Sequence, residues 1–190
     1  MPSLLHLNGP PGIGKSTLSA LWAESHPRTL NLDLDTVHLL VGGWRDPDQD
    51  THALVRPLGK AMASAYLANG HDVVLPQHLG RIDEVESFER IAHEQGADFR
   101  EVVLLDERAA AIARFDERRD DTPWNEHNRR VVADLGGDAF LDAMYDRLLD
   151  VLLARPSAVV VRSVPGEVEE TYAAVVRALA AQPDEPPAQG

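Results

Sequence analysis

Cysteine is absent from the 190 residues, so the chain can form neither disulfide bonds nor thiolate metal sites, as is usual for a protein of a reducing compartment. No apolar run reaches the roughly 18 residues of a membrane span. The first strand is expected to begin at Ser3, which leaves no room for a signal peptide ahead of it. We therefore expect a cytoplasmic protein with no membrane segment.

Basic residues are also few. The 18 lysines and arginines face 31 aspartates and glutamates, which gives a net charge of −13. This charge opposes non-specific attraction to nucleic acid and to anionic membranes, and it argues against nucleic acid as a partner. It remains compatible with a local basic cleft that binds an anionic nucleotide.

The pattern of apolar residues predicts an α/β protein. A length of 190 residues suits one domain, and short apolar strands alternate with helical patterns, which favours a mainly parallel sheet covered by helices on both faces. We expect a single domain over residues 1–181 and a disordered tail, rich in proline and polar residues, over 182–190. The five expected strands are 3–8, 29–33, 71–75, 99–105 and 157–163.

One stretch near the amino end carries recognisable chemistry. Gly9-Pro10-Pro11-Gly12-Ile13-Gly14-Lys15-Ser16 matches the phosphate-binding pattern G-x-x-x-x-G-K-[ST] at each fixed position. An apolar strand precedes it, and Thr17 continues into a helical pattern, which is the context that the motif requires. A chance glycine turn is the alternative reading. We predict that the segment binds a nucleoside triphosphate, ATP in the first instance.

The roles of these residues follow from the motif. Glycines let backbone N–H groups turn inward around an anion, and the amino end of the following helix adds positive potential. Lys15 supplies a mobile charge for the β- and γ-phosphates, and the Ser16 hydroxyl is placed to ligate Mg²⁺. Magnesium and ATP are therefore the expected cofactors.

Two carboxylates follow the second expected strand, in Asp33-Leu34-Asp35. The carboxyl ends of strands are where ligands bind in open α/β sheets. One carboxylate can lie near the metal while the other accepts a proton from a substrate hydroxyl, and we assign these roles to Asp33 and Asp35. The alternative is that the polar residues of this segment simply cap the helix that follows.

Three further positions are candidates for the acceptor side. Gln77 and His78 follow the third expected strand, at a strand end that often carries an acidic group for the metal, and a histidine there can equally be a structural hydrogen-bonding group. Arg56 could reach a substrate from the helix expected over 51–68, although a solvated arginine is the alternative. We expect that helix to bury Leu54, Leu58, Ala61, Met62, Ala65 and Tyr66. Trp44, in a polar loop, could stack on a substrate or plug the domain edge.

A second informative stretch surrounds Arg114, Arg118 and Arg119. Arg114 and Arg118 share a helical face, and a Thr-Pro loop follows, as in a lid over phosphates at about 115–130. Arginine forks match phosphoryl oxygens and stabilise the charge of phosphoryl transfer. The alternative is a solvated helix whose arginines are neutralised by neighbouring acids.

The order of these segments resembles the P-loop small-molecule kinase group, which includes shikimate kinase, gluconate kinase, chloramphenicol phosphotransferase and the zeta toxins. The resemblance spans about residues 3–181 and implies a three-layer P-loop NTPase fold, with a five-stranded parallel sheet and an arginine-bearing lid. It implies the proton-accepting role for Asp35. It also makes Arg114 the adenine-stacking arginine, and Arg118 or Arg119 the lid arginine.

The leading functional hypothesis is transfer of the γ-phosphoryl group of ATP to a hydroxyl of a small molecule such as a sugar, nucleoside, cyclitol or antibiotic. One alternative is a nucleotide-hydrolysing switch protein, which needs neither the Asp35 base nor an arginine lid. Another is a kinase for 5′-hydroxyl ends of nucleic acid, which the net charge of −13 opposes.

Overall fold

The computed structural model describes residues 1–46, 49–117 and 122–181. Five parallel strands form one sheet in the order β2-β3-β1-β4-β5. The strands are β1 (Ser3–Asn8), β2 (Leu30–Asn31), β3 (Val73–Leu75), β4 (Asp98–Leu105) and β5 (Val159–Arg162). The predicted α/β fold with a five-stranded parallel sheet is confirmed.

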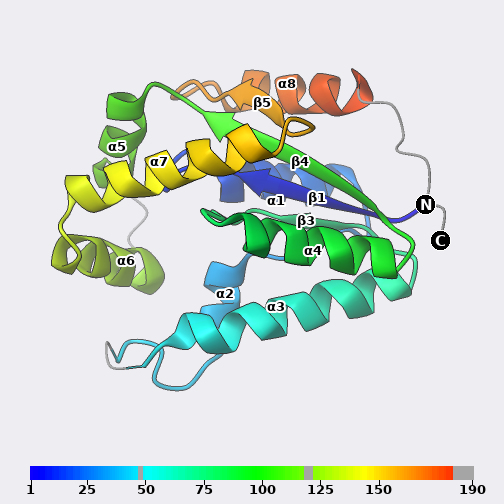
Figure 1. Ribbon diagram of the computed structural model, residues 1–190, viewed down its shortest axis with the longest axis horizontal. Coiled ribbons are helices and arrows are strands. Elements are labelled where there is room, and N and C mark those ends of the chain that lie inside the picture. The colour runs from blue at the N-terminus through cyan, green and yellow to red at the C-terminus, as the bar shows by residue number, and fades with distance from the viewer. Residues whose placement is uncertain (47–48, 118–121, 182–190) are drawn as a thin grey trace.

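Helices cover both faces of the sheet (Figure 1). One face carries α1 (Lys15–Ser25) and α8 (Val168–Ala181), and the other carries α3 (Thr51–Ala68) and α4 (Ile82–Glu94). The remaining helices are α2 (Leu34–His38), α5 (Arg108–Asp116), α6 (Pro123–Asp134) and α7 (Asp138–Ala154). In Figure 1, α2, α5 and α6 lie toward the carboxyl ends of the strands, where we predict the functional segments from the sequence.

Side chains of β1 point to the two faces of the sheet, and each face has its own apolar cluster. Leu4 belongs to the apolar cluster under α3 and α4, whereas Leu5 and Leu7 belong to the cluster under α1 and α8. All three side chains are at most 2% exposed. A central strand buried on both sides is typical of a parallel sheet, and it gives the phosphate loop that follows β1 a rigid support.

The face of α3 that packs on the sheet differs from the predicted one. Leu54, Leu58 and Met62 are 53%, 48% and 39% exposed, and the helix buries Thr51, Val55, Gly59, Ala63 and Leu67 instead. Gly59 explains the choice, because a Cβ atom there would overlap the Leu34 side chain of α2. The missing side chain at Gly59 lets α2 and α3 approach closely. The face that carries Leu54 and Leu58 therefore points outward.

The second strand is shorter than the predicted 29–33, because Asp33 already caps α2. Other boundaries agree with the prediction to within about two residues, including the break at Gly136 and Gly137 between α6 and α7. Within the described residues, no helix combines the length and the apolar character needed to cross a bilayer. The expected tail over 182–190 lies outside the described residues.

Candidate active site

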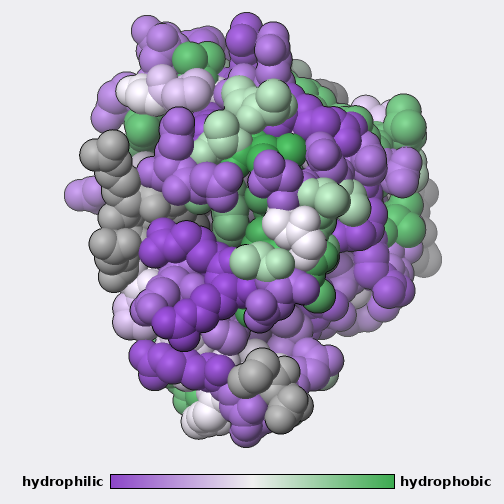
Figure 2. Space-filling model, turned by 90° about the vertical axis from the view of Figure 1, so that its left-hand side faces the viewer, coloured by the Kyte–Doolittle hydropathy of each residue, from purple (hydrophilic) through white to green (hydrophobic). Residues whose placement is uncertain are grey.

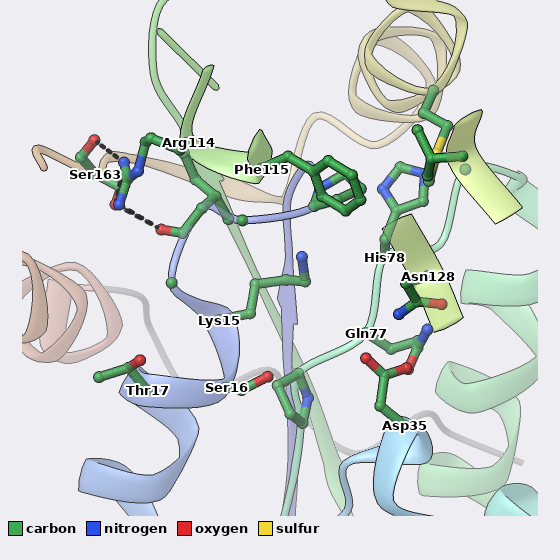
Figure 3. Close-up of a pocket in the computed structure, with 18 of the residues that line it drawn as sticks. Lys15, Ser16, Thr17, Asp35, Gln77, His78, Arg114, Phe115, Asn128 and Ser163 are labelled. Atoms are coloured by element: carbon green, nitrogen blue, oxygen red, sulfur yellow. Dashed lines mark hydrogen bonds between the residues drawn. The ribbon is translucent and has the colours of Figure 1, made fainter. Parts of the chain in front are cut away.

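A cavity of about 850 Å³ opens at the carboxyl ends of the strands. Figure 3 shows Lys15 near its centre, with Arg114 and Ser163 on one side and Asp35, Gln77 and Asn128 on the other. These residues come from α1, α5, the segment that follows β5, α2, the β3–α4 loop and α6. The predicted phosphate loop and the predicted acceptor residues therefore line one shared space.

Glycines shape the phosphate loop. Gly9 and Gly12 have φ values of +151° and +80°, a region that side chains rarely adopt. A Cβ atom at Gly9 would lie 2.7 Å from the Leu104 carbonyl oxygen, and one at Gly12 would lie 2.9 Å from the Phe115 nitrogen. The loop is thus packed between β4 and α5, at positions where only glycine fits.

Lys15 lies folded over this loop. Its Nζ atom donates hydrogen bonds to the backbone oxygens of Gly9 and Pro10, each over 2.9 Å. Residues Pro11 to Leu18 line the cavity, among them the Ser16 and Thr17 hydroxyls at the amino end of α1. A lysine and the first turn of an eleven-residue helix together form a setting that favours phosphate.

Asn8 joins the phosphate loop to the β3–α4 loop on the acceptor side. Its side chain donates to the Leu79 oxygen and accepts from the Leu79 nitrogen, each over 3.1 Å, and it also accepts from the Gly9 nitrogen over 2.9 Å. The asparagine is fully buried. Through these bonds the end of β1 fixes the segment that carries Gln77 and His78.

Arg114 holds the opposite side of the loop. Its guanidinium donates to the Ile13 oxygen over 3.1 Å and to the Ser163 oxygen over 3.0 Å, and it lies 3.6 Å from the Asp106 carboxylate. The Ser163 hydroxyl also donates to the Ile13 oxygen, over 2.9 Å. Arg114 therefore bridges the phosphate loop and the segment that follows β5. Its contact with adenine stays a prediction.

The two carboxylates after β2 have different surroundings. Asp33 is the N-cap of α2, and its Oδ1 accepts the Asp35 N–H over 3.0 Å. Among the described cavity residues, Asp35 is present and Asp33 is not. The capping alternative therefore holds for Asp33, whose place beside a metal stays a prediction. Asp35 lines the cavity, and its proton-accepting role also stays a prediction.

Gln77 lines the cavity near Asp35 (Figure 3). Its backbone oxygen accepts a hydrogen bond from Nε2 of the fully buried His6 over 3.0 Å. Its side-chain Oε1 is buried and has no hydrogen-bond partner among the described residues. An orphaned polar atom of this kind is uncommon in a folded protein and points to a group that arrives with a ligand.

His78 is held as a neutral imidazole. Its Nδ1 donates to the Gly9 oxygen over 3.2 Å, which leaves Nε2 without its proton. Burial, together with the positive charge of Lys15, lowers the pKa of His78 to about 3. His78 therefore brings a hydrogen-bond acceptor to the cavity and adds no positive charge for phosphate.

The predicted arginines are distributed unevenly. Arg56 lines the cavity but already pairs with Glu84 of α4, so it is neither free nor simply solvated. Arg118 and Arg119, and part of the predicted lid, lie outside the described residues. Arg147 of α7 also lines the cavity, lies 5.9 Å from the centre of the Phe140 ring, and was not predicted from the sequence.

An aromatic cluster joins α6 to the segment that carries Asp35. Trp124 stacks on His38 with ring centres 4.4 Å apart and lies 5.7 Å from Trp44. His38 lies 3.0 Å from the Thr51 hydroxyl at the start of α3. Trp44, 8% exposed, therefore packs at the domain edge, and of the two tryptophans it is Trp124 that contributes to the cavity lining described here.

Sequence reasoning missed the wall that α6 and α7 provide. Trp124, Asn128, Val131 and Leu135 recur at intervals of three and four residues, so one helical face could have been found in the sequence. The sequence could not show that this face turns toward the phosphate loop. Together with Phe140 and Met144 of α7, it lines the acceptor side of the cavity.

The residues present are compatible with Mg²⁺. Among the described residues no cluster of three or more His, Asp or Glu side chains could hold a metal by itself. Mg²⁺ does not need such a cluster, because it usually keeps several waters and binds one or two protein oxygens together with nucleotide phosphates. The Ser16 hydroxyl and the Asp35 carboxylate are oxygen donors in the cavity lining.

The sheet, the glycine loop leading into α1 and the cavity beside Lys15 define a P-loop nucleotide-binding protein. A comparison with family models matches residues 4–136 to a family described as AAA domain. The chain belongs to this family. A comparison with curated proteins gives no match.

Solved structures share the fold along nearly the whole chain. A gluconokinase from Sinorhizobium meliloti 1021 superposes with a TM-score of 0.61 at 18% identity, covering 94% of this chain and 92% of its own. The tunicamycin resistance protein of Deinococcus radiodurans gives 0.60 at 16% identity, with 98% and 100% covered. The deoxyadenosine kinase from M. mycoides gives 0.58 at 13%, with 94% and 98% covered. The predicted resemblance to P-loop small-molecule kinases is confirmed at the level of fold.

Proposed function

We propose that the protein transfers the γ-phosphoryl group of ATP to a hydroxyl group of a small molecule. The observation that carries the proposal is the placement of Asp35 in the same cavity as Lys15 and Ser16. A carboxylate facing a phosphate-binding loop is what phosphoryl transfer to an alcohol requires, because the acceptor must lose a proton as it attacks.

Asp35 acts on the acceptor. Its carboxylate accepts the hydroxyl proton while the alcohol oxygen forms a bond to the γ-phosphorus, and the bond from that phosphorus to the bridging oxygen of ADP breaks. The N-cap bond from its own N–H to Asp33 fixes the backbone of Asp35 at the start of α2. The carboxylate is therefore pre-positioned, and positioning supplies much of the catalysis in phosphoryl transfer.

The phosphate side neutralises charge. Lys15 exchanges its bonds to the Gly9 and Pro10 oxygens for the β- and γ-phosphates when the nucleotide binds. Ser16 is the cavity residue that would hold Mg²⁺, directly or through water, and a bound ion would supply neutralisation of the phosphate charge. The β5–α8 segment at Ser163, Val164 and Gly166 lines the end of the cavity where we place the adenine.

The switch and nucleic-acid alternatives make different demands. A hydrolysing switch needs no carboxylate aimed at an acceptor and no acceptor-sized extension of the cavity. A nucleic-acid kinase needs a basic track for the phosphate backbone, whereas Arg56 and Arg81 on the acceptor side of the cavity pair with Glu84 and Asp83. The carboxylate of Asp35 in the cavity and the pairing of these arginines favour a small-molecule acceptor.

The test is a comparison of binding with transfer. Asp35→Asn keeps the size of the side chain and removes its basicity, so we expect MgATP affinity within about twofold of wild type and a loss of transfer of about 10²-fold or more. Calorimetry measures the first quantity. A coupled ADP-release assay against sugars, nucleosides, cyclitols, antibiotics and short oligonucleotides at low salt measures the second.

Asp83→Asn is the matched control, because Asp83 is an exposed carboxylate whose partner Arg81 lines the same cavity. It should retain full transfer. Full transfer by Asp35→Asn would remove the proton-accepting role. ADP release that no hydroxyl compound stimulates would favour the switch, and stimulation by oligonucleotides alone would favour the nucleic-acid kinase.

A further inference from the structure

Several apolar side chains line the acceptor side of the cavity. Phe115 of α5, Val131, Val132 and Leu135 at α6, and Phe140 and Met144 of α7 form what we call the apolar wall. Figure 2 shows this end of the molecule, where apolar residues gather in the middle of a largely hydrophilic face. Leu135, at the carboxyl end of α6, is 56% exposed although it lines the cavity.

Polar groups stand on the other side. Asp35, Gln77 and Asn128 lie together in Figure 3, away from the Phe115 ring. Two polar atoms of the cavity residues are buried with no hydrogen-bond partner among the described residues: Oε1 of Gln77, which accepts hydrogen bonds, and Nε1 of Trp124, which donates them. A ligand that presents both a donor and an acceptor would satisfy these two atoms.

The charges at this end are already compensated in part. Arg56 pairs with Glu84, and Arg81 pairs with Asp83 over 3.0 Å. An acidic acceptor would place its own charge against Asp35, and Arg147 of α7 is the further cation that lines this cavity. A polyhydroxylated acceptor would leave hydroxyls unpaired against the apolar wall, which is unfavourable.

We propose, on the basis of the kinase function above, that the acceptor is an amphipathic hydroxy compound. An apolar ring or chain lies against the apolar wall, and one hydroxyl faces Asp35. A neighbouring O–H or N–H donates to the Gln77 amide, and an oxygen accepts from Trp124. The fold resembles that of a gluconokinase, but this wall selects against polyols such as gluconate.

The first arm of the test uses matched acceptors that differ by one apolar group. Phenyl glucoside is compared with glucose, the benzyl ether of glycerol with glycerol, and gluconate is included as the acidic polyol. Binding is measured by calorimetry with Mg²⁺ and a non-hydrolysable ATP analogue, and transfer by ADP release. We expect the arylated member of each pair to bind about tenfold tighter or more, because its ring removes apolar surface from water.

The second arm uses paired variants. Leu135→Gln should raise the Kd and KM of an arylated acceptor about threefold to tenfold, with kcat and the Kd for ADP unchanged. Leu153→Gln is the matched control, since Leu153 is 83% exposed on α7 and is not among the cavity residues. Both leucines are exposed, so neither substitution should affect folding. Wild type should bind the benzyl ether of glycerol more tightly than benzyl alcohol, because benzyl alcohol has no second hydroxyl to donate to the Gln77 amide. Gln77→Met should remove this preference.

The outcomes separate this inference from the kinase proposal. In one outcome, arylated acceptors bind, and bind more weakly to Leu135→Gln, yet receive no phosphoryl group. That result would support the acceptor class and contradict the kinase function. Efficient transfer to glucose, glycerol or gluconate that is indifferent to Leu135→Gln would support the kinase and overturn the acceptor class. Equal binding of both members of each pair, including no measurable binding of either, would also overturn it.

Discussion

Nη2 of Arg114 donates to the backbone oxygen of Ile13 over 3.1 Å, so the last turn of α5 is tied to the middle of the phosphate loop. The same guanidinium reaches Ser163 at the end of β5 through Nη1. One side chain therefore connects the loop that binds phosphate with the segment where we place the adenine. A single point charge cannot make this connection, because it needs the fork of an arginine.

Arg114→Lys should show that the fork matters. The substitution keeps the charge but leaves the Ile13 and Ser163 oxygens without at least one donor, so we expect a loss of about 1–3 kcal/mol in the free energy of unfolding. MgATP and MgADP affinities should fall together, by about tenfold. Urea denaturation and calorimetry measure the two effects. Wild-type values in Arg114→Lys would contradict the bridging role.

Gly12→Ala tests the fit between the loop and α5. A Cβ atom there would lie 2.9 Å from the Phe115 nitrogen, and the φ of +80° is itself unfavourable for alanine. Gly70→Ala is the matched control, because Gly70 has a φ of +76° and no heavy atom within 4 Å of the added Cβ. We expect Gly70→Ala to lose about 1 kcal/mol of stability and Gly12→Ala to lose clearly more, with weakened nucleotide binding. Equal losses would show that α5 does not restrict the loop.

Lys15→Ala should weaken both nucleotide binding and transfer. Removing the side chain leaves the γ-phosphate without its mobile cation, and charged hydrogen bonds contribute about 1.5–3 kcal/mol each. We expect the Kd for MgATP to rise about tenfold to a hundredfold, with little change in stability. Lys60→Ala is the control, because Lys60 lies over Phe88, 5.9 Å from the centre of its ring, and is not among the residues that line the cavity. Unchanged ATP affinity in Lys15→Ala would contradict the assignment of the phosphate loop.

Acid should destabilise the protein through His38. Burial, with the neighbouring charges of His52 and His127, lowers its pKa to about 4 from 6.5. Between these values the unfolded chain binds a proton that the folded protein does not, so the free energy of unfolding falls as the pH is lowered. His38→Gln should reduce the difference in stability between about pH 7 and pH 5 by about 2 kcal/mol.

Urea denaturation at the two pH values measures this effect, and His93→Gln, at an exposed position of α4, is the control. His78, whose pKa is lowered to about 3, acts in the same direction and keeps part of the pH dependence in the variant. A His38→Gln protein with the full wild-type dependence would show that His38 does not contribute.

The fold and the phosphate side could be predicted because their signals are local. Strand, glycine loop and helix stand next to one another in the sequence, and Gly9 to Ser16 fixes its own conformation through its glycines. Asp35 could also be predicted, because it follows a strand whose carboxyl end must meet the same edge of the sheet. These inferences need no knowledge of which helical faces pack together.

The remaining features depend on packing between distant segments. The residues of α3 form two apolar stripes, and the choice between them depends on Leu34 approaching Gly59, which the sequence does not show. Likewise, Arg155 bonds to Glu101 and Glu89, at separations of 54 and 66 residues. The apolar wall of α6 and α7 is a further result of this kind, because it depends on how these helices are placed against the phosphate loop.

The neighbouring rings of Trp44 and Trp124 have a practical consequence. The chain contains three tryptophans, and these two lie 5.7 Å apart beside His127 and His38, at the joint between α6 and the segment that carries Asp35. Their emission is therefore an intrinsic optical reporter of that joint, whereas Trp22 lies on α1 against Tyr172 of α8. A stopped-flow record of the native protein can follow movement of α6 in real time, without any attached dye.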